Sequence, residues 1–484
     1  MQTLRSALAA GLVGSSCVAF GSLLACSDGD TSSTGPSGAT ASTSAGSGGE
    51  GGSSATSVGG HGGATSVGGH GGAETTNGAG GAGGSSETPK KSFGYYFAAD
   101  KATGKHVISV VDASGGKPVV TSVGADELDA LTGANGNMKG PAWGDSIATA
   151  DGARVFANGA NADRVLVLET ATNTVETVLK AGQKPLHIYE PNDNGEIWSH
   201  NDTDGTFTVL DAKTLATKST LLVSQTNTGH GKLLYAPTLG TQYFATITAN
   251  PGAFSIDGAA FKATFVALCG QPCVDDPMTP ADESKNTCGG THDKTFDPAT
   301  KTAIFQCSGV TKGKVAFYDV TAKTVTKDLV TLPVSAFAYN HDKTYNLVFD
   351  NTANTVGVWD ANAPGHTLDM FDATVTITGN ASGRGTDFRV NDSGEWEAWI
   401  PQSNGTKLVV LNLKKSTTEE IEIGAITLPA GESARRGAIA GDWFYTYADS
   451  GLVLVNVKTR AVVAAPKPAG NIARVSAALV PASK

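Results

Sequence analysis

The chain has 484 residues, of which 61 are glycine, 17% are charged and 7% are aromatic. Its 45 acidic and 35 basic side chains give a formal net charge of −10. This balance argues against a nucleic-acid-binding protein, which needs a basic face to displace counterions. Beyond the N-terminus no apolar run reaches membrane-spanning length, so the sequence excludes a polytopic membrane protein.

Residues 1–25 have the layout of an export signal, because Arg5 precedes an apolar stretch that ends in small residues. Leu23-Leu24-Ala25-Cys26 resembles a bacterial lipobox, in which the cysteine becomes the lipidated first residue of the mature protein. An ordinary signal peptide and a single uncleaved membrane helix are the alternatives. The sequence therefore predicts a lipoprotein of the bacterial cell envelope, anchored to the membrane through Cys26 on the periplasmic or the cell-surface face.

Residues 26–91 are predicted to be a disordered tether. Glycine, serine, threonine and alanine dominate the segment, and 21 of the 61 glycines fall between residues 27 and 89. Such a composition buries too little apolar surface to offset the entropy of the chain. The tether contains the nine-residue sequence ATSVGGHGG twice in succession. His61 and His70, one in each copy, are either weak metal-capturing side chains or by-products of the repeat.

Residues 92–484 are predicted to be one domain built from a repeated strand. The repeat is a five-residue segment of alternating apolar character that usually closes on an acidic or amide residue. It occurs at Ile108–Asp112, Val165–Glu169, Phe207–Asp211, Val315–Asp319, Val356–Asp360, Leu408–Asn412 and Leu452–Asn456, with a degenerate copy at Phe265–Cys269. The copies recur every 41 to 58 residues and helical periodicity is nearly absent, which is typical of four-stranded propeller blades.

Eight copies predict an all-β fold with a single β-propeller of eight blades. Seven blades are the alternative if one copy belongs to an insertion hairpin. A last strand at Ile472–Val480 is expected to close the ring by adding to the first blade. The strand run and its period resemble the YVTN-type bacterial propellers, a resemblance that implies the fold and says little about function.

Four cysteines fall close together, at Cys269, Cys273, Cys288 and Cys307. An exported protein matures in an oxidising compartment, so disulfides are expected. Proximity along the chain favours Cys269 with Cys273 and Cys288 with Cys307. A four-cysteine zinc site is the alternative, although intervals of 3, 14 and 18 residues fit no common zinc knuckle. The two disulfides would hold down an insertion at roughly Asn250–Asn286.

Three histidines, His187, His230 and His292, recur near the expected start of the innermost strand of three consecutive blades. Innermost strands line the channel of a propeller, so these imidazoles should converge and offer a transition-metal site of the three-histidine kind. Asp145 and Asp387 fall in the same phase on flanking blades. Each is a candidate fourth ligand, or a carboxylate that fixes an imidazole tautomer. The alternative is that the histidines are solvated polar residues at a channel mouth.

The other four histidines of the domain are expected away from this site. His341 falls in a turn out of phase with the three, and it is predicted to lie on the surface. His106, His200 and His366 are assigned to outer strands or loops.

The motifs around the three histidines allow a narrower resemblance. Lys184-Pro185-Leu186-His187, then Gly229-His230-Gly231, then Cys288-Gly-Gly-Thr-His292 with the later Cys307 resemble periplasmic zinc metallochaperones of the AztD type. The resemblance implies a propeller that binds Zn²⁺ through these histidines and passes it to the solute-binding protein of an ABC transporter. It also supports pairing Cys288 with Cys307. The chain departs from the family in its lipid anchor and tether, and in lacking a dense histidine-rich motif for metal capture.

The sequence predicts a monomeric binding protein and not an enzyme. It contains no G-x-S-x-G, no G-x-x-x-x-G-K-[ST] and no H-E-x-x-H motif. Three histidines and a water molecule are also a catalytic arrangement, so a zinc hydrolase is an alternative, but no general base is recognisable beside them. The main competing function is a metal-free propeller that binds a protein or a glycan on its loops.

Overall fold

The computed structural model describes residues 90–481, except 100–105, 116, 124–127, 129–142, 225–228, 249–251, 269–287, 289, 308–312, 333, 382, 429–433 and 467–470. The predicted signal, the tether with its two histidines, Cys26, Cys269 and Cys273 therefore lie outside the described residues. None of the helices in the described ranges is long and apolar enough to cross a membrane.

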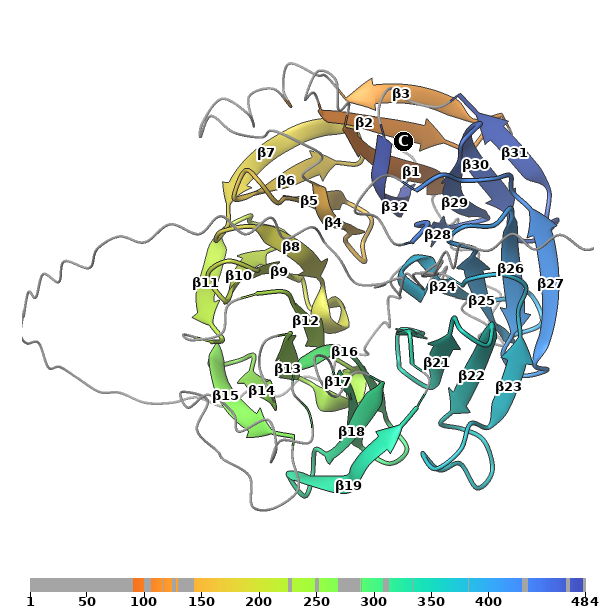
Figure 1. The fold of residues 1–484 in the computed structure, drawn as a ribbon. Helices are drawn as coiled ribbons and strands as arrows, with labels where there is room; N and C mark the ends of the chain where they lie inside the picture. The colour runs from red at the N-terminus through yellow and green to blue at the C-terminus, as the bar shows by residue number, and fades with distance from the viewer. Residues whose placement is uncertain are drawn as a thin grey trace, which may run out of the picture. The chain divides into compact units, whose positions relative to one another are not determined.

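Eight four-stranded antiparallel sheets are arranged as blades around a central axis (Figure 1). Blade one contains β1 (Lys90–Ala99), β2 (His106–Asp112), β3 (Val119–Val123) and the last strand of the chain, β32 (Asn471–Pro481). In the other seven blades the strands follow the chain order from the axis outward. The all-β fold with eight blades is thus confirmed.

The remaining strands have these bounds. Blades two to four contain β4 (Trp143–Ala148), β5 (Arg154–Gly159), β6 (Arg164–Glu169), β7 (Thr174–Lys180); β8 (Pro185–Tyr189), β9 (Glu196–Asn201), β10 (Thr206–Asp211), β11 (Thr217–Leu222); β12 (Gly231–Leu234), β13 (Gln242–Ile247), β14 (Gly252–Asp257), β15 (Lys262–Ala267). Blades five and six contain β16 (Thr291–Asp297), β17 (Thr302–Cys307), β18 (Lys314–Asp319), β19 (Thr324–Thr331); β20 (Ala336–Tyr339), β21 (Tyr345–Asp350), β22 (Thr355–Asp360), β23 (Ala373–Thr376). Blades seven and eight contain β24 (Asp387–Val390), β25 (Trp396–Pro401), β26 (Lys407–Asn412), β27 (Thr417–Glu422); β28 (Ala438–Ala440), β29 (Trp443–Ala448), β30 (Gly451–Asn456), β31 (Val462–Ala465).

Short 3-10 turns lie in some of the connections between strands. Three of them are η1 (Pro191–Asp193), η2 (Pro237–Leu239) and η4 (Gly383–Gly385).

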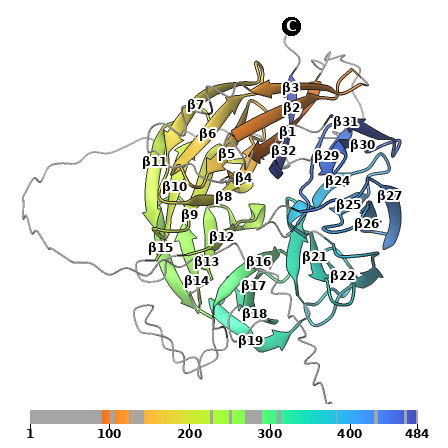
Figure 2. The same cartoon turned by 45° about the horizontal axis from the view of Figure 1, so that its top comes forward.

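The ring is closed by β32, which pairs antiparallel with β1 and forms the innermost strand of blade one (Figure 2). Tyr95 lies opposite Ser476 in this pairing. The first and last described strands therefore share one sheet, which confirms the predicted closure.

The repeated segment of the sequence is the third strand of a blade, and its closing residue makes the following turn. Asp319 ends β18 and accepts hydrogen bonds through Oδ1 from the backbone N–H groups of Thr321 and Ala322, at 2.7 and 2.8 Å. Asn456 does the same at the end of β30. Short polar side chains of this kind replace turn backbone as hydrogen-bond acceptors, which explains why the repeat ends on aspartate or asparagine.

The degenerate copy in blade four was assigned to the wrong strand. Phe265 lies in β15, the outermost strand, whereas the true third strand is β14, which ends on Asp257. Gly252 and Ser255 weaken the apolar alternation of β14, so this strand does not match the repeated pattern. The outer strand β15 does match it, because its Phe265 ring packs on the ring of Phe254 at a centroid distance of 5.6 Å. The insertion expected at roughly Asn250–Asn286 is wrong in its first half, because β14 and β15 occupy it.

The hydrophobic core is divided into eight layers, one between each pair of neighbouring blades. The layer between blades one and two, for example, contains Tyr95, Val110, Val155 and Leu166, all at most 1% exposed. Side chains on one face of a blade pack on the facing side chains of the next, so each blade depends on both neighbours.

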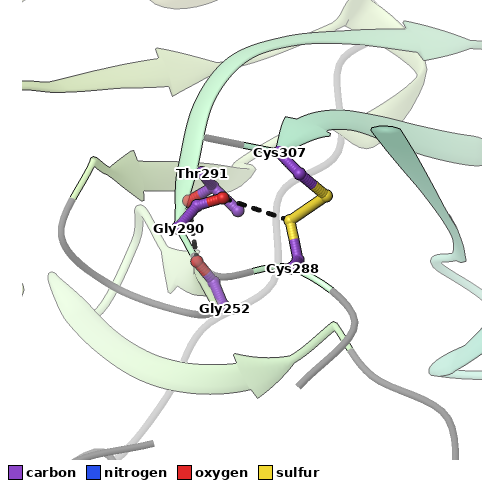
Figure 3. The surroundings of a disulfide bond; sticks show 5 residues. All are labelled: Gly252, Cys288, Gly290, Thr291 and Cys307. Atoms are coloured by element: carbon purple, nitrogen blue, oxygen red, sulfur yellow. Dashed lines mark hydrogen bonds between the residues drawn. A yellow bond between two sulfur atoms is a disulfide. The ribbon is translucent and has the colours of Figure 1, made fainter. Parts of the chain in front are cut away.

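The structure pairs Cys288 with Cys307 in a disulfide (Figure 3). Cys288 precedes the innermost strand β16, and Cys307 ends the neighbouring strand β17. Next to it, the Thr291 hydroxyl donates a hydrogen bond to the carbonyl of Gly252 in blade four. The disulfide therefore fixes the start of the strand that carries His292.

Candidate metal centre

The three predicted histidines lie at the N-terminal ends of innermost strands of blades three, four and five. His187 is the third residue of β8, His230 immediately precedes β12, and His292 is the second residue of β16. The structure brings them together: the His187 and His230 ring centroids are 4.6 Å apart, and the His230 and His292 rings stack at 5.0 Å.

Irregular strand pairing changes the direction in which the His187 and His292 side chains point. The register shifts in β8 between Pro185 and His187, and in β16 between Thr291 and Lys294. A β-bulge rotates the residues beside it away from the regular alternation and recurs next to functional sites. The bulges let His187 and His292 point toward their neighbours across blade boundaries.

The closest contact in the cluster joins the Nε2 atoms of His187 and His230, which are 3.2 Å apart. Each Nδ1 atom faces a carboxylate: His187 contacts Asp145 at 2.5 Å, and His230 contacts Asp202 at 3.3 Å. An ionised carboxylate only accepts hydrogen bonds, so both Nδ1 atoms donate. The neutral imidazole of His187 then presents its Nε2 lone pair toward Nε2 of His230.

Asp145, on β4 of blade two, binds two partners. Its Oδ2 accepts from His187, and its Oδ1 is 2.9 Å from Nε of Arg474 on β32. Burial alone would raise the pKa of the Asp145 carboxyl, but His187, Arg474 and Arg436 hold that pKa well below its usual range. Burial lowers the pKa of His187 to about 3, so its imidazole is neutral at neutral pH.

Asp202 and His200 belong to this cluster, and the sequence analysis missed both. The Asp202 carboxylate bridges Nδ1 of His200, at 2.9 Å, and Nδ1 of His230. His200 is on β9 opposite His187 and is fully buried, so its assignment to an exposed outer position is wrong. Burial opposes ionisation of Asp202, but the hydrogen bonds from the two histidines lower its pKa. The alternation His200-x-Asp202 places both side chains on one face of the strand end, and this was the available signal.

Asp387, on β24 of blade seven, lies elsewhere around the channel. Its carboxylate accepts hydrogen bonds from the backbone N–H groups of Ile439 at 2.6 Å and Phe388 at 2.8 Å. Burial raises its pKa to about 7. The structure does not bring this carboxylate into contact with the three histidines.

The assignment of the other histidines to the surface is also wrong. His106 is 1% exposed and packs edge-on against Trp143. The His366 side chain is 3% exposed and contacts the carboxylates of Asp297 and Asp372. His341 follows β20 at the opposite mouth, where its Nε2 is 3.4 Å from Asp193 and burial lowers its pKa to about 4. All three serve packing or ion pairing between blades.

Among the described residues, no group of three or more histidine, cysteine, aspartate or glutamate side chains is arranged so that it could hold a metal ion. Two of the three imidazoles nevertheless have a suitable spacing. Two nitrogen ligands at about 2.05 Å from a tetrahedral zinc ion are roughly 3.3 Å apart. The observed Nε2–Nε2 distance of 3.2 Å matches that separation, and a neutral imidazole is the donor that zinc prefers.

No protein-family model and no curated protein matches this sequence. Solved structures do: apo AztD from Citrobacter koseri aligns with a TM-score of 0.53 at 15% identity, over 81% of this chain and 99% of that one. A second crystal structure of Citrobacter koseri AztD aligns with a TM-score of 0.52 at 15% identity, over 81% and 98%. This chain therefore has an AztD-like β-propeller fold, as the motifs predicted.

Proposed function

We propose that the protein binds Zn²⁺ at one mouth of its channel through Nε2 of His187, His230 and His292. The observation that carries the proposal is the pair of facing Nε2 atoms 3.2 Å apart. A zinc ion between them would be bound by both nitrogens at the spacing of a tetrahedral site. The motif resemblance to AztD-type zinc metallochaperones supports the same identification.

Asp145 and Asp202 act as the carboxylates that orient two of the ligands. Each accepts from the Nδ1–H of one histidine, which fixes the tautomer with a free Nε2 and raises its basicity. Asp145 thus holds His187 and is not needed as a direct ligand, and Asp387 stays a prediction as a fourth ligand. The Thr246 hydroxyl donates to the backbone carbonyl of His292 and holds that strand start against blade four.

The role we propose for the bound ion is storage or handover and not catalysis. The two carboxylates nearest the histidines, Asp145 and Asp202, are already engaged by cationic or imidazole partners. Neither is therefore placed to act as a general base for a metal-bound water. Handover to the solute-binding protein of an ABC transporter, from a lipid-anchored position in the envelope, completes the proposal.

Zinc titration of the purified full-length chain tests this function. We expect near-stoichiometric binding at neutral pH that is lost when His187, His230 and His292 are all replaced by alanine. A matched control replaces His106, His341 and His366 instead, which leaves the cluster intact. Absence of zinc binding by the native chain would eliminate the proposal, as would equal binding by the triple variant.

A further inference from the structure

A cavity of about 780 Å³ follows the channel along the innermost strands β4, β28 and β32. It runs from one mouth to the other. Asp145 on β4 contacts Arg474 on β32 at the mouth with the histidines, and Gly152 after β4 lies against the backbone of Leu479 at the opposite mouth. None of the three clustered histidines is among the described residues that line the cavity.

Small side chains make the wall of this cavity. Midway along it, the hydroxyls of Ser146 and Ser476 are joined by a hydrogen bond of 2.6 Å. Ala148, Ala440 and Ala477 line the same wall. The volume is within the range of cavities that hold small organic ligands.

The end of the cavity at the histidine mouth is positively charged. Arg384, Arg436 and Arg474 line it, and Nη1 of Arg436 contacts the backbone carbonyl of Arg384 at 3.5 Å. Two carboxyl groups also line this end. Asp145 is already bound by Arg474 and by an imidazole, and burial raises the pKa of Asp387 to about 7, so that Asp387 is only partly ionised at neutral pH. Positive charge therefore dominates here.

The opposite end of the cavity is acidic, because Asp151, Glu190 and Asp193 line it. Burial raises the pKa values of Glu190 and Asp193 to about 7 each. His341 and Lys343 act on Asp193, but burial lowers the pKa of His341 to about 4 and that of Lys343 to about 7. Neither carries a full positive charge at neutral pH. The cationic group of a ligand would therefore favour the ionised form of both buried carboxyls.

Three further basic side chains at the acidic end do not offset its charge. Nε and Nη2 of Arg154 are 2.6 and 2.8 Å from a carboxylate on the neighbouring strand β7. Lys90 and Lys213 are exposed to solvent, where salt screens their charge. The cavity thus has a positive end and a negative end, although its lining as a whole is nearly neutral.

The two charged ends are separated by about the length of an innermost strand. Asp145 and Asp151 are six residues apart along β4 and the turn after it, which span at most about 20 Å at roughly 3.3 Å per residue. Between them β4 and β28 are the innermost strands of their sheets and pair with no other strand on the channel side. An extended peptide can form main-chain hydrogen bonds with such an edge.

We propose that this cavity binds a short peptide with free termini, its carboxylate at the arginine end and its ammonium group at the acidic end. A nearly neutral lining with separated charges fits a ligand that is itself a zwitterion. Four extended residues span about 13 Å, and the charged side chains at the two ends close the remaining distance. An arginine fork binds a carboxylate through two hydrogen bonds. This binding activity goes beyond the proposed zinc function and does not depend on it.

Calorimetric titration of the metal-free full-length chain with tetraalanine at neutral pH tests the proposal. We expect saturable binding that is at least tenfold weaker for N-acetylated tetraalanine and at least tenfold weaker for its C-terminal amide. Absence of tetraalanine binding overturns the proposal, as does equal binding of either blocked peptide. Because the titration contains no metal, a failure of the zinc function leaves its result unchanged.

Two variants test which end holds which terminus. Arg384→Gln should bind tetraalanine and its amide equally but still discriminate against the acetylated peptide. Asp193→Asn should show the reverse pattern. Arg164→Gln and Glu169→Gln, both on β6 away from the channel, are matched controls and should bind as the native chain does. Circular dichroism of each variant establishes that the fold is retained. Unchanged discrimination against both blocked peptides in both channel variants overturns the assigned orientation and the site.

Discussion

At the scale of single residues, the pairing of His187 and His230 with a carboxylate each is the feature that prepares the proposed site. Asp202 serves two histidines at once, since its two oxygens face Nδ1 of His200 and Nδ1 of His230. The Nε2 atom of His200 is buried and has no hydrogen-bond partner among the described residues, so Asp202 is its support. If the Asp202 carboxylate moved away, both imidazoles would lose their hydrogen-bond acceptor.

Asp202→Asn should therefore weaken zinc binding by roughly 10–100-fold, the usual effect of removing the carboxylate behind a metal-binding histidine. The amide no longer dictates which nitrogen of His230 carries the proton. Zinc competition with a fluorescent chelator measures the change. Asp211→Asn, at the end of the next strand, makes the same chemical change in a turn and should leave the affinity within a factor of two. Similar losses in both variants would contradict the role of Asp202.

Glu190, near the opposite mouth, gives the molecule a predictable pH dependence. Burial raises its pKa from 4.5 to about 7, although the N–H of Ala150 donates to Oε2 at 2.8 Å. The folded chain thus holds this proton more tightly than the unfolded chain. Its contribution to stability is present below pH 4.5 and is lost as the pH rises toward 7.

In Glu190→Gln this part of the pH dependence should disappear. Between pH 4.5 and 7 the native chain should lose up to about 3 kcal/mol more stability than the variant, at about 1.36 kcal/mol per pKa unit. Urea unfolding at several pH values measures the two slopes. Glu169→Gln, an exposed carboxyl at the end of β6, is the control. Parallel slopes for the native chain and Glu190→Gln would show that burial does not hold this proton.

The sequence predicted that the three histidines of the innermost strands lie together, as they do in the structure, but it did not predict their partners, and the role of the three as zinc ligands stays a prediction. His187, His230 and His292 could be found because one position recurs in three blades. The alternation His200-x-Asp202 shows only that the two side chains share a face, because their contacts with the other histidines depend on the register between β8 and β9 and on a side chain that reaches across a blade boundary.

At the scale of elements, the turn after the third strand recurs and carries backbone strain. In six of the blades the residue four positions after the one that closes this strand adopts a positive φ, as Lys323 does at 58° and Ser416 at 53°. The backbone N–H of Lys323 donates to the carbonyl of Asp319 at 2.8 Å, which holds this conformation in place. This left-handed conformation costs a residue with a Cβ atom about 1–2 kcal/mol of conformational energy.

Lys323→Gly should stabilise the protein by about 0.5–1 kcal/mol, since glycine relieves this strain at an exposed position without removing a packed side chain. Lys314→Gly replaces an exposed lysine at the start of β18, where the backbone is extended, and should be destabilising by a similar amount. Equilibrium urea unfolding distinguishes the two. A loss of stability in both variants would contradict the strain argument.

These turns also explain why the third strands of most blades could be predicted from the sequence. Segments ending in aspartate or asparagine were recognised because the side chain that ends the strand also makes the turn. In blade four the apolar signal pointed to β15, since contact between Phe254 and Phe265 makes that outer strand apolar. Local pattern cannot separate a third strand from a fourth when both bury aromatic rings.

At the scale of the whole molecule, stability depends on the closure of the ring. Residues of β32 enter two interblade layers: Ala478 and Val480 pack between blades one and two, and Ile472 packs between blades eight and one. The Ser92 hydroxyl of β1 also donates to the carbonyl of Ala440 in blade eight at 2.7 Å. The number of blades could be predicted from the repeat in the sequence. Which side chains meet at the channel mouth could not, because residues of distant blades come together only when the ring is closed.

Removal of residues 471–484 should destabilise the domain by on the order of 5 kcal/mol or more, because burial of each large aliphatic side chain contributes about 1.5–3 kcal/mol. Differential scanning calorimetry of the truncated chain measures the loss. A chain shortened only by residues 482–484 is the control and should melt with the native protein. Equal melting of both truncations would contradict closure through β32.

Arg474, which contacts Asp145, lies on the last described strand. The contacts of Asp145 are therefore completed late in the synthesis of the chain. Asp145 and the three histidines emerge from the ribosome long before β32, yet the guanidinium that completes the carboxylate's contacts arrives among the final residues. A nascent or prematurely terminated chain therefore lacks the finished mouth. Any metal held by the predicted histidines would meet the complete mouth only after β32 has been synthesised.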